Sequence, residues 1–457
     1  MNAVGISAAA RYLPWFRLTA EEIARTQRRP APRRAVARRL AGYDEDALTM
    51  AVAAARLLPA EALAGVERLL FATTTPPYLV KNNASAAHAV LGLAETVPAF
   101  DAGSALRSSF GAIQGAAAGS LLLTGDVNTA RPGAATELSH GDAGVALLFG
   151  PAEDSIAELV DSASVTDEVL DHWRLPSEAT LQASEDRFPV SRLLPAVDRA
   201  LAKLSVDTVE HVIVSAPSSR VAAAAGQRAG AFGPVRSVAG IGFAGSADLP
   251  LQLCNVLALA RPGDRILALS VADGGDALVL RCTQRLAARR PFEARESGDG
   301  VVPTYLDALA WRGLVHREPP RRPEPAPVSP AVAARRTEWK YALHGSRCGS
   351  CGAVATPPQR VCLRCRSTDT AERVDLSRLS ATIRTYSVDR LAYSPNPPMI
   401  AAIVDFDGGG RLEVELTDTA GPLAVGDRVQ MTFRLRHSSG GIHNYAWKAI
   451  PEGTRHG

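Results

Sequence analysis

The chain has 457 residues, of which 46% are apolar and 21% are charged. This composition is ordinary for a globular protein, and the length is too great for one ordinary domain. The net charge of +3 favours neither nucleic acid nor an acidic membrane surface as a partner. The first residues lack a basic segment before an apolar core, and apolar runs are short, so we expect a cytoplasmic protein that does not span a membrane.

The first 315 residues alternate segments typical of strands with Ala-rich segments typical of helices. Such alternation predicts a layered α/β domain over residues 1–315. Turn signals such as Pro-Gly-Asp separate the segments. The expected strands are 68–75, 120–125, 144–150, 211–217, 265–271 and 276–282, and the clearest expected helices are 44–58 and 249–260.

A weak internal similarity connects the two halves of this domain. HGDAGVALLFG (140–150) and DGGDALVLRC (273–282) both run from a Gly/Asp turn into an apolar strand. Each follows a helix, a strand and a polar loop. The pattern indicates two similar halves that pack together.

A Pro-rich linker is expected at residues 316–337, because HREPPRRPEPAPVSP combines Pro and charge and favours an extended spacer. Beyond it lie a metal-ligand cluster, assigned to residues 338–370, and several short β-like runs, assigned to 371–457. Turn residues separate the runs, so they predict a small β-barrel. The expected barrel strands are 381–388, 399–407, 411–418 and 428–436.

Four cysteines form two Cys-x-x-Cys pairs, Cys348 with Cys351 and Cys362 with Cys365. Two such knuckles can complete a tetrahedral four-sulfur shell, so we expect a zinc ribbon. Four thiolates leave no open position, and the Zn²⁺ is therefore expected to be structural. The alternative is a redox pair or a chance cluster. Cys254 and Cys282 stand alone in apolar segments, as inert core residues of a reducing compartment do.

The C-terminal part resembles the zinc-ribbon and OB-fold module that accompanies thiolase-like enzymes. The similarity lies in PPQRVCLRC after the first knuckle, VDFDGGGRLEVELTD in the barrel and the ending GIHNYAWKAIP. The resemblance implies an OB-fold barrel. It also implies a module that binds acyl-CoA or bridges to a partner thiolase.

The N-terminal part resembles hydroxymethylglutaryl-CoA synthase of the archaeal and bacterial type, within the thiolase superfamily. The similarity lies in GYDEDALTMAVAAA (42–55), TTTPPYLVKN (73–82), DHWR with a later RF (171–174, 187–188) and ARPGDRILALS (260–270). The resemblance implies a doubled five-layer α-β-α-β-α fold. It also implies a homodimer and a coenzyme A thioester as substrate or ligand.

The family's reactive groups are replaced at the positions that the resemblance assigns to them. A cysteine before a helix attacks the acyl thioester in this superfamily, and FDAGSALRSSFGAIQGA (100–116) has Leu106 there. The family's histidine falls on Ser215, its second asparagine or histidine on Phe243, and its glutamate close to Thr74. A leucine cannot form an acyl-enzyme, so we do not expect the usual covalent mechanism.

Several polar residues near these positions are candidates for other chemistry, and each has a structural alternative. Ser104 is a nucleophile or a helix N-cap, and Arg107 is an anion clamp or a solvent-facing side chain. Ser108 and Ser109 are site residues or packing residues of the helix. His140 and Asp142 are site residues or members of a tight turn. Tyr78 is a further candidate polar residue of the site.

Three functions follow from the resemblance. The first is an enzyme that forms or cleaves a C–C bond beside an acyl thioester, on coenzyme A or a carrier protein, by aldol or Claisen chemistry without the cysteine nucleophile. The second is a catalytically silent acyl-CoA-binding subunit or scaffold that pairs with an active thiolase or synthase. The third is an acyltransferase that uses Ser104 or Ser108 as its nucleophile.

Overall fold

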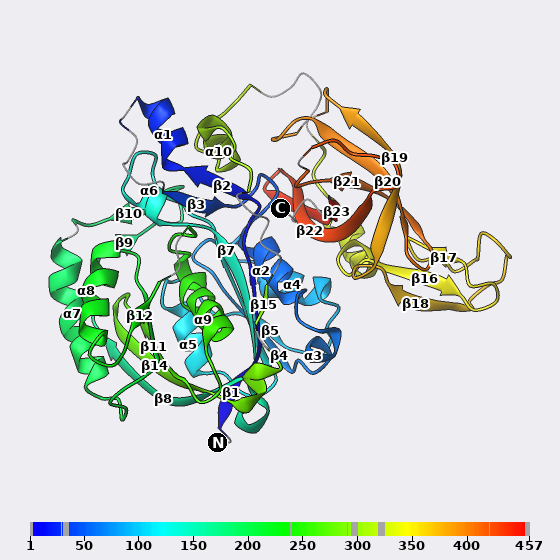
Figure 1. The fold of residues 1–457 in the computed structure, drawn as a ribbon. Coiled ribbons are helices and arrows are strands. Elements are labelled where there is room, and N and C mark those ends of the chain that lie inside the picture. Colours follow the sequence, from blue (N-terminus) through cyan, green and yellow to red (C-terminus); the bar gives the residue numbers. More distant parts are fainter. Residues whose placement is uncertain are drawn as a thin grey trace.

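A computed structural model describes residues 3–452 except 29, 31–35, 186, 238–239, 290, 294–299, 319–324, 393 and 420. It shows an α/β domain that carries a smaller β-rich domain on one side (Figure 1). In the described part of the chain, none of the helices is long and apolar enough to cross a membrane.

One large sheet runs through the N-terminal domain in the order β12-β11-β13-β14-β8-β1-β7-β6-β4-β5, with β15 paired to β1 at one side. Every expected strand of this domain is confirmed, with ends that differ by a few residues. The strands are β1 (Val4–Tyr12), β4 (Arg68–Ala72), β5 (Ala99–Asp101), β6 (Ser120–Asp126), β7 (Ala143–Pro151), β8 (Ala157–Thr166), β11 (His211–Ser215), β12 (Val235–Arg236), β13 (Arg265–Ser270), β14 (Gly274–Cys282) and β15 (Phe292–Glu293).

The strand order confirms the two similar halves. In one half, β4 is parallel to β6 and β6 is antiparallel to β7. In the other half, β11 is parallel to β13 and β13 is antiparallel to β14. The strands β1 and β8 pair at the centre and join the halves. The expected echo between 140–150 and 273–282 therefore marks two equivalent strands, β7 and β14.

Helices form the layers between and outside the two halves of the sheet. Helices α5 and α9 pack together with strands of both halves in one buried apolar cluster, and helices α7 and α8 cover the outer face of the second half. Helix α2 covers the outer face of the first half. This arrangement is the expected α-β-α-β-α layering (Figure 1). The helices are α2 (Ala47–Ala55), α5 (Ser108–Gln114), α7 (Arg187–Leu201), α8 (Ser219–Ala229) and α9 (Asp248–Leu259).

Smaller elements complete this domain. The antiparallel strands at 16–19 and 37–40 and the helix at 305–311 pack together at one end through their apolar side chains. The remaining elements are β2 (Phe16–Thr19), α1 (Ala20–Gln27), β3 (Ala37–Leu40), α3 (Ala60–Ala64), α4 (Ala84–Val90), α6 (Thr136–Ser139), β9 (His172–Trp173), β10 (Gln182–Ala183) and α10 (Tyr305–Trp311), with three short 3₁₀ turns at 152–154, 245–247 and 284–287.

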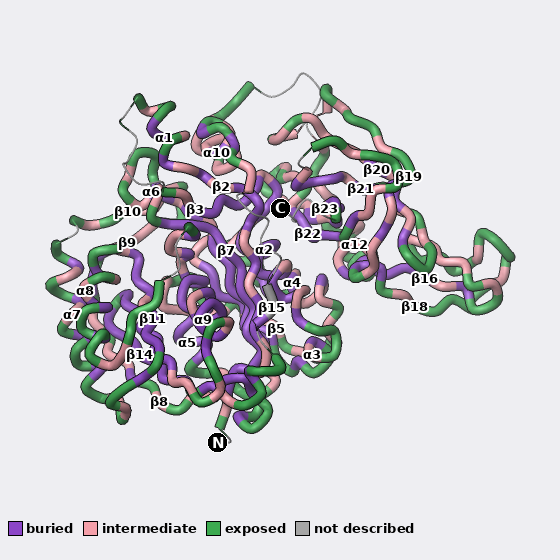
Figure 2. The backbone as a smooth tube through the Cα atoms, in the orientation of Figure 1, coloured by how far each residue is buried: buried purple, intermediate pink, exposed green. Residues whose placement is uncertain are grey.

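Helix α2 lies unusually close to the sheet. A Cβ atom at Gly125 would lie 2.1 Å from the Ala47 carbonyl oxygen, and one at Gly144 would lie 2.2 Å from the Met50 carbonyl oxygen. Only glycine permits this approach. The small side chains of ALTMAVAAA let α2 be buried between the sheet and the second domain, as Figure 2 shows.

The C-terminal domain contains a closed five-stranded barrel and a three-stranded ribbon. The four expected barrel strands are confirmed, and the barrel is closed by a fifth, β23, within the ending GIHNYAWKAIP. The third ribbon strand, β18, extends to Asp375, five residues past the expected boundary. The elements are α11 (Pro330–Arg335), α12 (Thr337–Lys340), β16 (His344–Cys348), β17 (Val354–Ala355), β18 (Ala371–Asp375), β19 (Ser380–Asp389), β20 (Met399–Phe406), β21 (Arg411–Leu416), β22 (Arg428–Ser439) and β23 (Ile442–Pro451).

Helix α11 lies inside the segment 316–337 that was expected to be an extended linker. Ser329 precedes this helix and Pro330 begins it, a first position where proline is favoured because its missing N–H has no partner to lose. The prolines upstream of Ser329 favour an extended chain, whereas PAVAAR after it is rich in Ala and forms a helix. Residues 319–324 of the linker lie outside the described residues.

The two domains are joined by a buried group of charges, here called the interdomain ion cluster. Arg434 of β22 contacts Asp44 and Glu45 of the N-terminal domain and Asp418 of the barrel. Lys448 of β23 lies 3.0 Å from Asp44 Oδ2 and 2.7 Å from Glu415 Oε1. Both cationic side chains are only 1% exposed. The acidic residues of the motif GYDEDA therefore hold the barrel in place.

Candidate functional site

A cavity of about 340 Å³ opens where loops of the two halves meet. Its walls come from the carboxyl ends of β4, β5, β6 and β11 and the residues after them, from the turns before β7 and β14, from β9 and the residues after it, and from residues 243–245. Thr74, Leu106 and Phe243 all line it. Three positions at which the resemblance expects reactive groups are thus brought together, although they lie far apart in the sequence.

Ser215, the fourth of these positions, is buried and does not line this cavity. Pro217 and Phe243 do line it, and they also line a second cavity, of about 320 Å³, together with Asp248. Burial raises the pKa of Asp248 to about 6, against the opposing effect of the Ser215 hydroxyl and of Gln252. Asp248 accepts hydrogen bonds from Gln252 Nε2 at 2.6 Å and from the backbone N–H of Ala244 at 3.2 Å.

The raised pKa of Asp248 makes stability depend on pH. The folded protein binds this proton more tightly than the unfolded chain does, so the contribution of Asp248 to stability falls as pH rises from about 4 to about 6 and is constant above. A shift of about two units corresponds to about 3 kcal/mol. We expect the free energy of unfolding of Asp248→Asn to lack this decline.

Urea unfolding of the wild type and of Asp248→Asn between pH 4 and pH 7 measures the effect. The difference in unfolding free energy between the two proteins should change by about 3 kcal/mol across this range. Titration of other groups cancels in the difference. Parallel pH profiles for the two proteins would show that Asp248 does not titrate there.

Asp126 ties together two segments beside the first cavity, the loop 73–75 and the turn at Ser246. Its Oδ1 accepts hydrogen bonds from the side chains of Thr73, Thr74 and Thr75 and from the Thr74 backbone N–H, at 2.8 to 3.0 Å. Its Oδ2 accepts from the backbone N–H and the hydroxyl of Ser246, at 2.6 and 2.8 Å. Burial raises the pKa of Asp126, and these hydrogen bonds lower it. The carboxyl group of Asp126 therefore holds these segments in place through its hydrogen bonds.

His140 lines the cavity and packs against Phe243, with ring centroids 5.0 Å apart. Its Nε2 lies 2.8 Å from the Pro217 carbonyl oxygen, which can only accept, so Nε2 carries the proton. Burial lowers the pKa of His140 to about 4. The imidazole is therefore neutral near pH 7, and its Nε2–H is used by the backbone. His140 thus borders the cavity, as a site residue would, and also holds the backbone beside the turn before β7.

His172 also lines the cavity, 6.1 Å from His140 between ring centroids. It lies on β9, and its backbone N–H and its Nδ1 lie 2.8 and 3.2 Å from the two carboxylate oxygens of Asp171. The Asp171 carboxylate can only accept, so it fixes the proton on Nδ1. This pair lies within the motif DHWR, which the resemblance to hydroxymethylglutaryl-CoA synthase includes without assigning a reactive group to it. The sequence could have indicated this pair only through two adjacent titratable residues, Asp171 and His172, before the aromatic Trp173.

The residues around Leu106 are placed differently from expectation. Helix α5 begins at Ser108, its N-cap is Arg107, and Ser104 therefore is not the N-cap. Ser104 lines the cavity, as Leu106 does. Ser108 Oγ instead accepts a hydrogen bond from the Ala105 backbone N–H at 3.0 Å and holds the turn. Ser109 is buried.

Arg107 is held by a buried carboxylate. Its Nε and Nη2 donate to the two oxygens of Asp276, both at 2.6 Å, and Asp276 is buried. Its Nη1 donates to Thr166 Oγ1 at 2.8 Å. This bidentate ion pair links α5 of one half to β14 of the other. Arg107 thus neither faces open solvent nor lines the cavity.

Asp142 and Tyr78 hold segments together. The buried Asp142 accepts from the backbone N–H groups of Ala41 and Asn128, each at 2.6 Å, and forms an ion pair with Arg312. The Tyr78 hydroxyl accepts from the backbone N–H of His443, at the tip of the β22–β23 hairpin, at 2.7 Å. His443 Nε2 lies 3.1 Å from the Pro77 carbonyl oxygen. The barrel therefore contacts the loop that carries Thr74.

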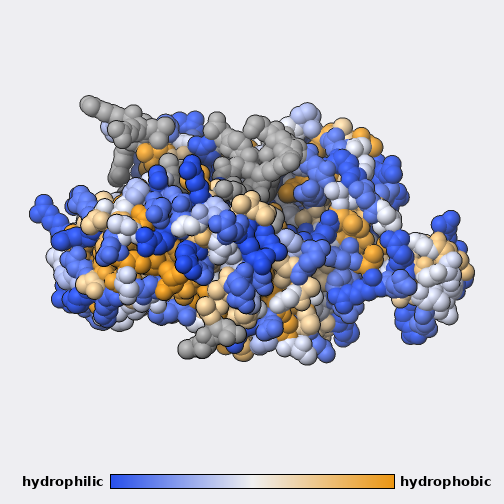
Figure 3. Space-filling model, turned by 60° about the horizontal axis from the view of Figure 1, so that its bottom comes forward, coloured by the Kyte–Doolittle hydropathy of each residue, from blue (hydrophilic) through white to orange (hydrophobic). Residues whose placement is uncertain are grey.

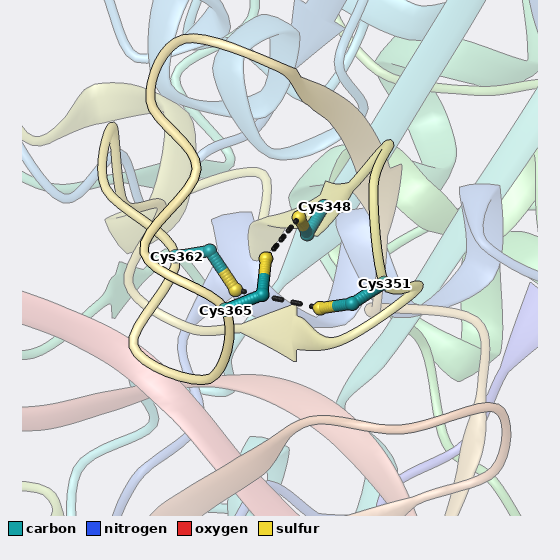
Figure 4. Close-up of side chains that lie close together, drawn as sticks. All are labelled: Cys348, Cys351, Cys362 and Cys365. Atoms are coloured by element: carbon teal, nitrogen blue, oxygen red, sulfur yellow. Dashed lines mark hydrogen bonds between the residues drawn. The ribbon is translucent and has the colours of Figure 1, made fainter.

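The four cysteines of the ribbon converge on one point (Figure 4). Their sulfur atoms all lie within 4.8 Å of one another, with Cys348 and Cys365 at 3.6 Å and Cys351 and Cys362 at 3.6 Å. A tetrahedral zinc site with Zn–S bonds of about 2.3 Å has sulfur–sulfur distances of about 3.8 Å. The Ser367 hydroxyl, 3.1 Å from Cys348 Sγ, lowers the pKa of that thiol to about 5. The geometry fits a structural Zn²⁺.

Comparisons with known proteins agree with both parts of the chain. The chain is 27% identical over 319 residues to the hydroxymethylglutaryl-CoA synthase of Aeropyrum pernix, which covers 64% of this chain and 88% of that protein. It is 30% identical over 124 residues to a DUF35 domain-containing scaffold protein of Methanothermobacter thermautotrophicus, which covers 26% of this chain and 92% of that protein. Residues 373–434 match the model of the ChsH2 C-terminal OB-fold domain.

Solved structures show the same fold. An HMG-CoA synthase complexed with CoA matches with a TM-score of 0.52 and 16% identity, over 68% of this chain and 87% of that one. The curacin pathway HMG synthase in complex with apo donor-ACP matches with a TM-score of 0.54 and 16% identity, over 68% and 88%. The protein is therefore a thiolase-fold protein with a C-terminal OB-fold domain. Its N-terminal part is similar to hydroxymethylglutaryl-CoA synthases, and its C-terminal part belongs to the DUF35 domain family.

Proposed function

We propose that the protein binds an acyl thioester in the 340 Å³ cavity and forms or cleaves a C–C bond beside it without a covalent acyl-enzyme. The supporting observation is that Thr74, Leu106 and Phe243 line one cavity. None of the described residues that line it is a cysteine. Aldol or Claisen chemistry needs a positioned base and stabilisation of an enolate, and neither needs a thiol.

The thioester carrier is coenzyme A or an acyl carrier protein. Similar structures hold CoA in one case and a donor carrier protein in another. The cavity opens at the ends of the strands, where α/β proteins commonly bind ligands. We also propose a homodimer formed through the N-terminal domain, as the resemblance implies.

Acetyl-CoA binding measured by calorimetry tests the proposal. Leu106→Trp adds bulk inside the cavity and should weaken binding about tenfold or more, which is a loss of about 1.4 kcal/mol. Val332→Trp is the matched control, because Val332 lines a separate cavity of about 580 Å³ between α11 and the barrel. Binding that survives Leu106→Trp and is lost in Val332→Trp would place the ligand in the wrong domain for this proposal.

A catalytically silent subunit is the second candidate. The observation that favours it is the DUF35-type module, whose relatives are called scaffold proteins. In this case acyl-CoA binds but no turnover occurs, whereas activity appears when an active thiolase or synthase is added. Turnover by the isolated protein would eliminate this candidate.

An acyltransferase with a serine nucleophile is the third candidate. Ser104 lines the cavity, whereas Ser108 holds the turn before α5. Intact mass after incubation with acyl-CoA distinguishes this candidate from the others. An acyl adduct that is absent from Ser104→Ala would favour it and would contradict the non-covalent proposal.

A further inference from the structure

We infer that His172, oriented by Asp171, is the base that moves the proton in the C–C chemistry of the cavity. The inference rests on the proposed binding of an acyl thioester there and adds the identity of the proton carrier. No family position anticipates it, because the resemblance assigns the reactive groups to residues 74, 106, 215 and 243. Its basis is the arrangement of Asp171 and His172 beside the cavity.

The first step of the argument is the orientation of the imidazole. Asp171 accepts from the His172 backbone N–H at 2.8 Å and faces Nδ1 at 3.2 Å. Both side chains are at most 5% exposed, so neighbouring atoms hold this geometry. With the proton on Nδ1, the lone pair is on Nε2, on the other side of the ring from Asp171. A carboxylate, an oriented imidazole and a cavity are the parts of a general base.

The second step is the choice between the two histidines of the cavity. His140 donates its Nε2–H to the Pro217 carbonyl oxygen, and burial lowers its pKa to about 4, so it is a weak base. His172 instead faces the Asp171 carboxylate through Nδ1, so its Nε2 is not taken up by that partner. The other charged or titratable residues that line the cavity are Asp126, Arg174 and Asp273. Asp126 accepts six hydrogen bonds, and Arg174 donates to the Thr74 carbonyl oxygen at 2.8 Å.

The third step is the chemistry that such a base performs. In the cleaving direction, Nε2 accepts the proton of a β-hydroxyl group on the acyl chain. The C–C bond breaks, a carbonyl compound leaves, and the electron pair passes to the thioester as an enolate. The imidazolium then returns the proton to the α-carbon, so no oxidant or reductant is needed. In the forming direction, Nε2 first removes the α-proton, and the alkoxide product takes it back.

Exchange of the α-hydrogens of acetyl-CoA in D₂O tests the inference, because it needs the base and the thioester but no acceptor. The full chain is incubated with acetyl-CoA, and deuterium uptake is followed by mass spectrometry. We expect His172→Gln to lower the exchange rate by about 10² to 10⁴-fold with acetyl-CoA affinity unchanged. His211→Gln is the matched control, since His211 pairs with Asp264 at 3.0 Å away from the cavity and should exchange at the wild-type rate.

Two further variants separate a chemical role from a structural one. In Asp171→Asn, an amide N–H₂ facing Nδ1 would favour the tautomer with the proton on Nε2, and the base would lose its lone pair. Exchange should fall while affinity stays, and the ¹⁵N shifts of His172 should report the other tautomer. In His172→Ala, added imidazole should restore part of the exchange, as it would not if His172 only held the fold.

The outcomes test the role of His172 separately from the proposed binding of an acyl thioester. Acetyl-CoA binding with exchange that depends on His172 supports both. Binding without exchange, or with equal exchange in His172→Gln, overturns the inference and leaves the acyl-thioester site standing. Absence of binding by the full chain overturns the proposed function, and the inference falls with it.

Discussion

We expect the Cys348→Ser variant to bind no zinc and to lose the folded ribbon. A structural site of this kind supplies on the order of 10 kcal/mol to the folding of a small domain. The ribbon consists of three short strands that project from the molecule (Figure 1), and its outer end forms the lobe that stands apart at one side of the space-filling view (Figure 3). Its cysteine end therefore has few other contacts that could hold it. Zinc content per chain, measured by mass spectrometry, and protease sensitivity between residues 344 and 375 report the two effects.

Cys254→Ala is the matched control for this experiment. Cys254 is buried in the apolar core of the N-terminal domain, away from the ribbon. This variant should keep one zinc per chain, and any loss of stability should come from the core alone. One zinc per chain in Cys348→Ser would contradict the four-sulfur site.

We expect Arg434→Met to destabilise the chain by about 3 to 5 kcal/mol, because it leaves buried carboxylates without their cation. Arg434 is the shared partner of Asp44, Glu45 and Asp418 in the interdomain ion cluster. Burial raises the pKa of Glu45 and Arg434 opposes that effect, so Glu45 should take up a proton in the variant. Urea unfolding followed by tryptophan fluorescence measures the loss.

Arg411→Met is the control for charge removal. Arg411 pairs with Asp405 at 2.6 Å on the surface of the same barrel, with 64% of its side chain exposed. Exposed ion pairs contribute about 1 kcal/mol or less. If Arg434→Met costs no more than Arg411→Met, the interdomain ion cluster does not hold the barrel in place.

The sequence predicts the framework of this protein well because strong local patterns specify it. Apolar runs such as SLLLTG and RILALSV become buried strands β6 and β13, and the Gly/Asp turns before β7 and β14 reveal the doubling. The four cysteines converge as their spacing predicts. The fifth barrel strand, β23, is not among the predicted strands, because the charged residue Lys448 stands in a run of residues that are all buried.

The site was predicted less completely, because its residues meet only through the long-range topology. The resemblance assigns Leu106 and Phe243 to positions of reactive groups, and the structure places both at one cavity. Nothing local shows that Arg107 reaches Asp276, 169 residues away, or that Asp126 supports two loops. Nothing in the sequence around His172 predicts a site residue, because only the folded structure places β9 beside the cavity.

The contact of the β22–β23 hairpin with Pro77 and Tyr78 has a thermodynamic consequence. The same loop gives Thr74 to the cavity and receives the hydrogen bonds of His443. A ligand that orders this loop must strengthen the docking of the barrel, and docking of the barrel must strengthen ligand binding by the same factor. Ligand occupancy of the cavity and docking of the barrel would therefore report on each other in this chain.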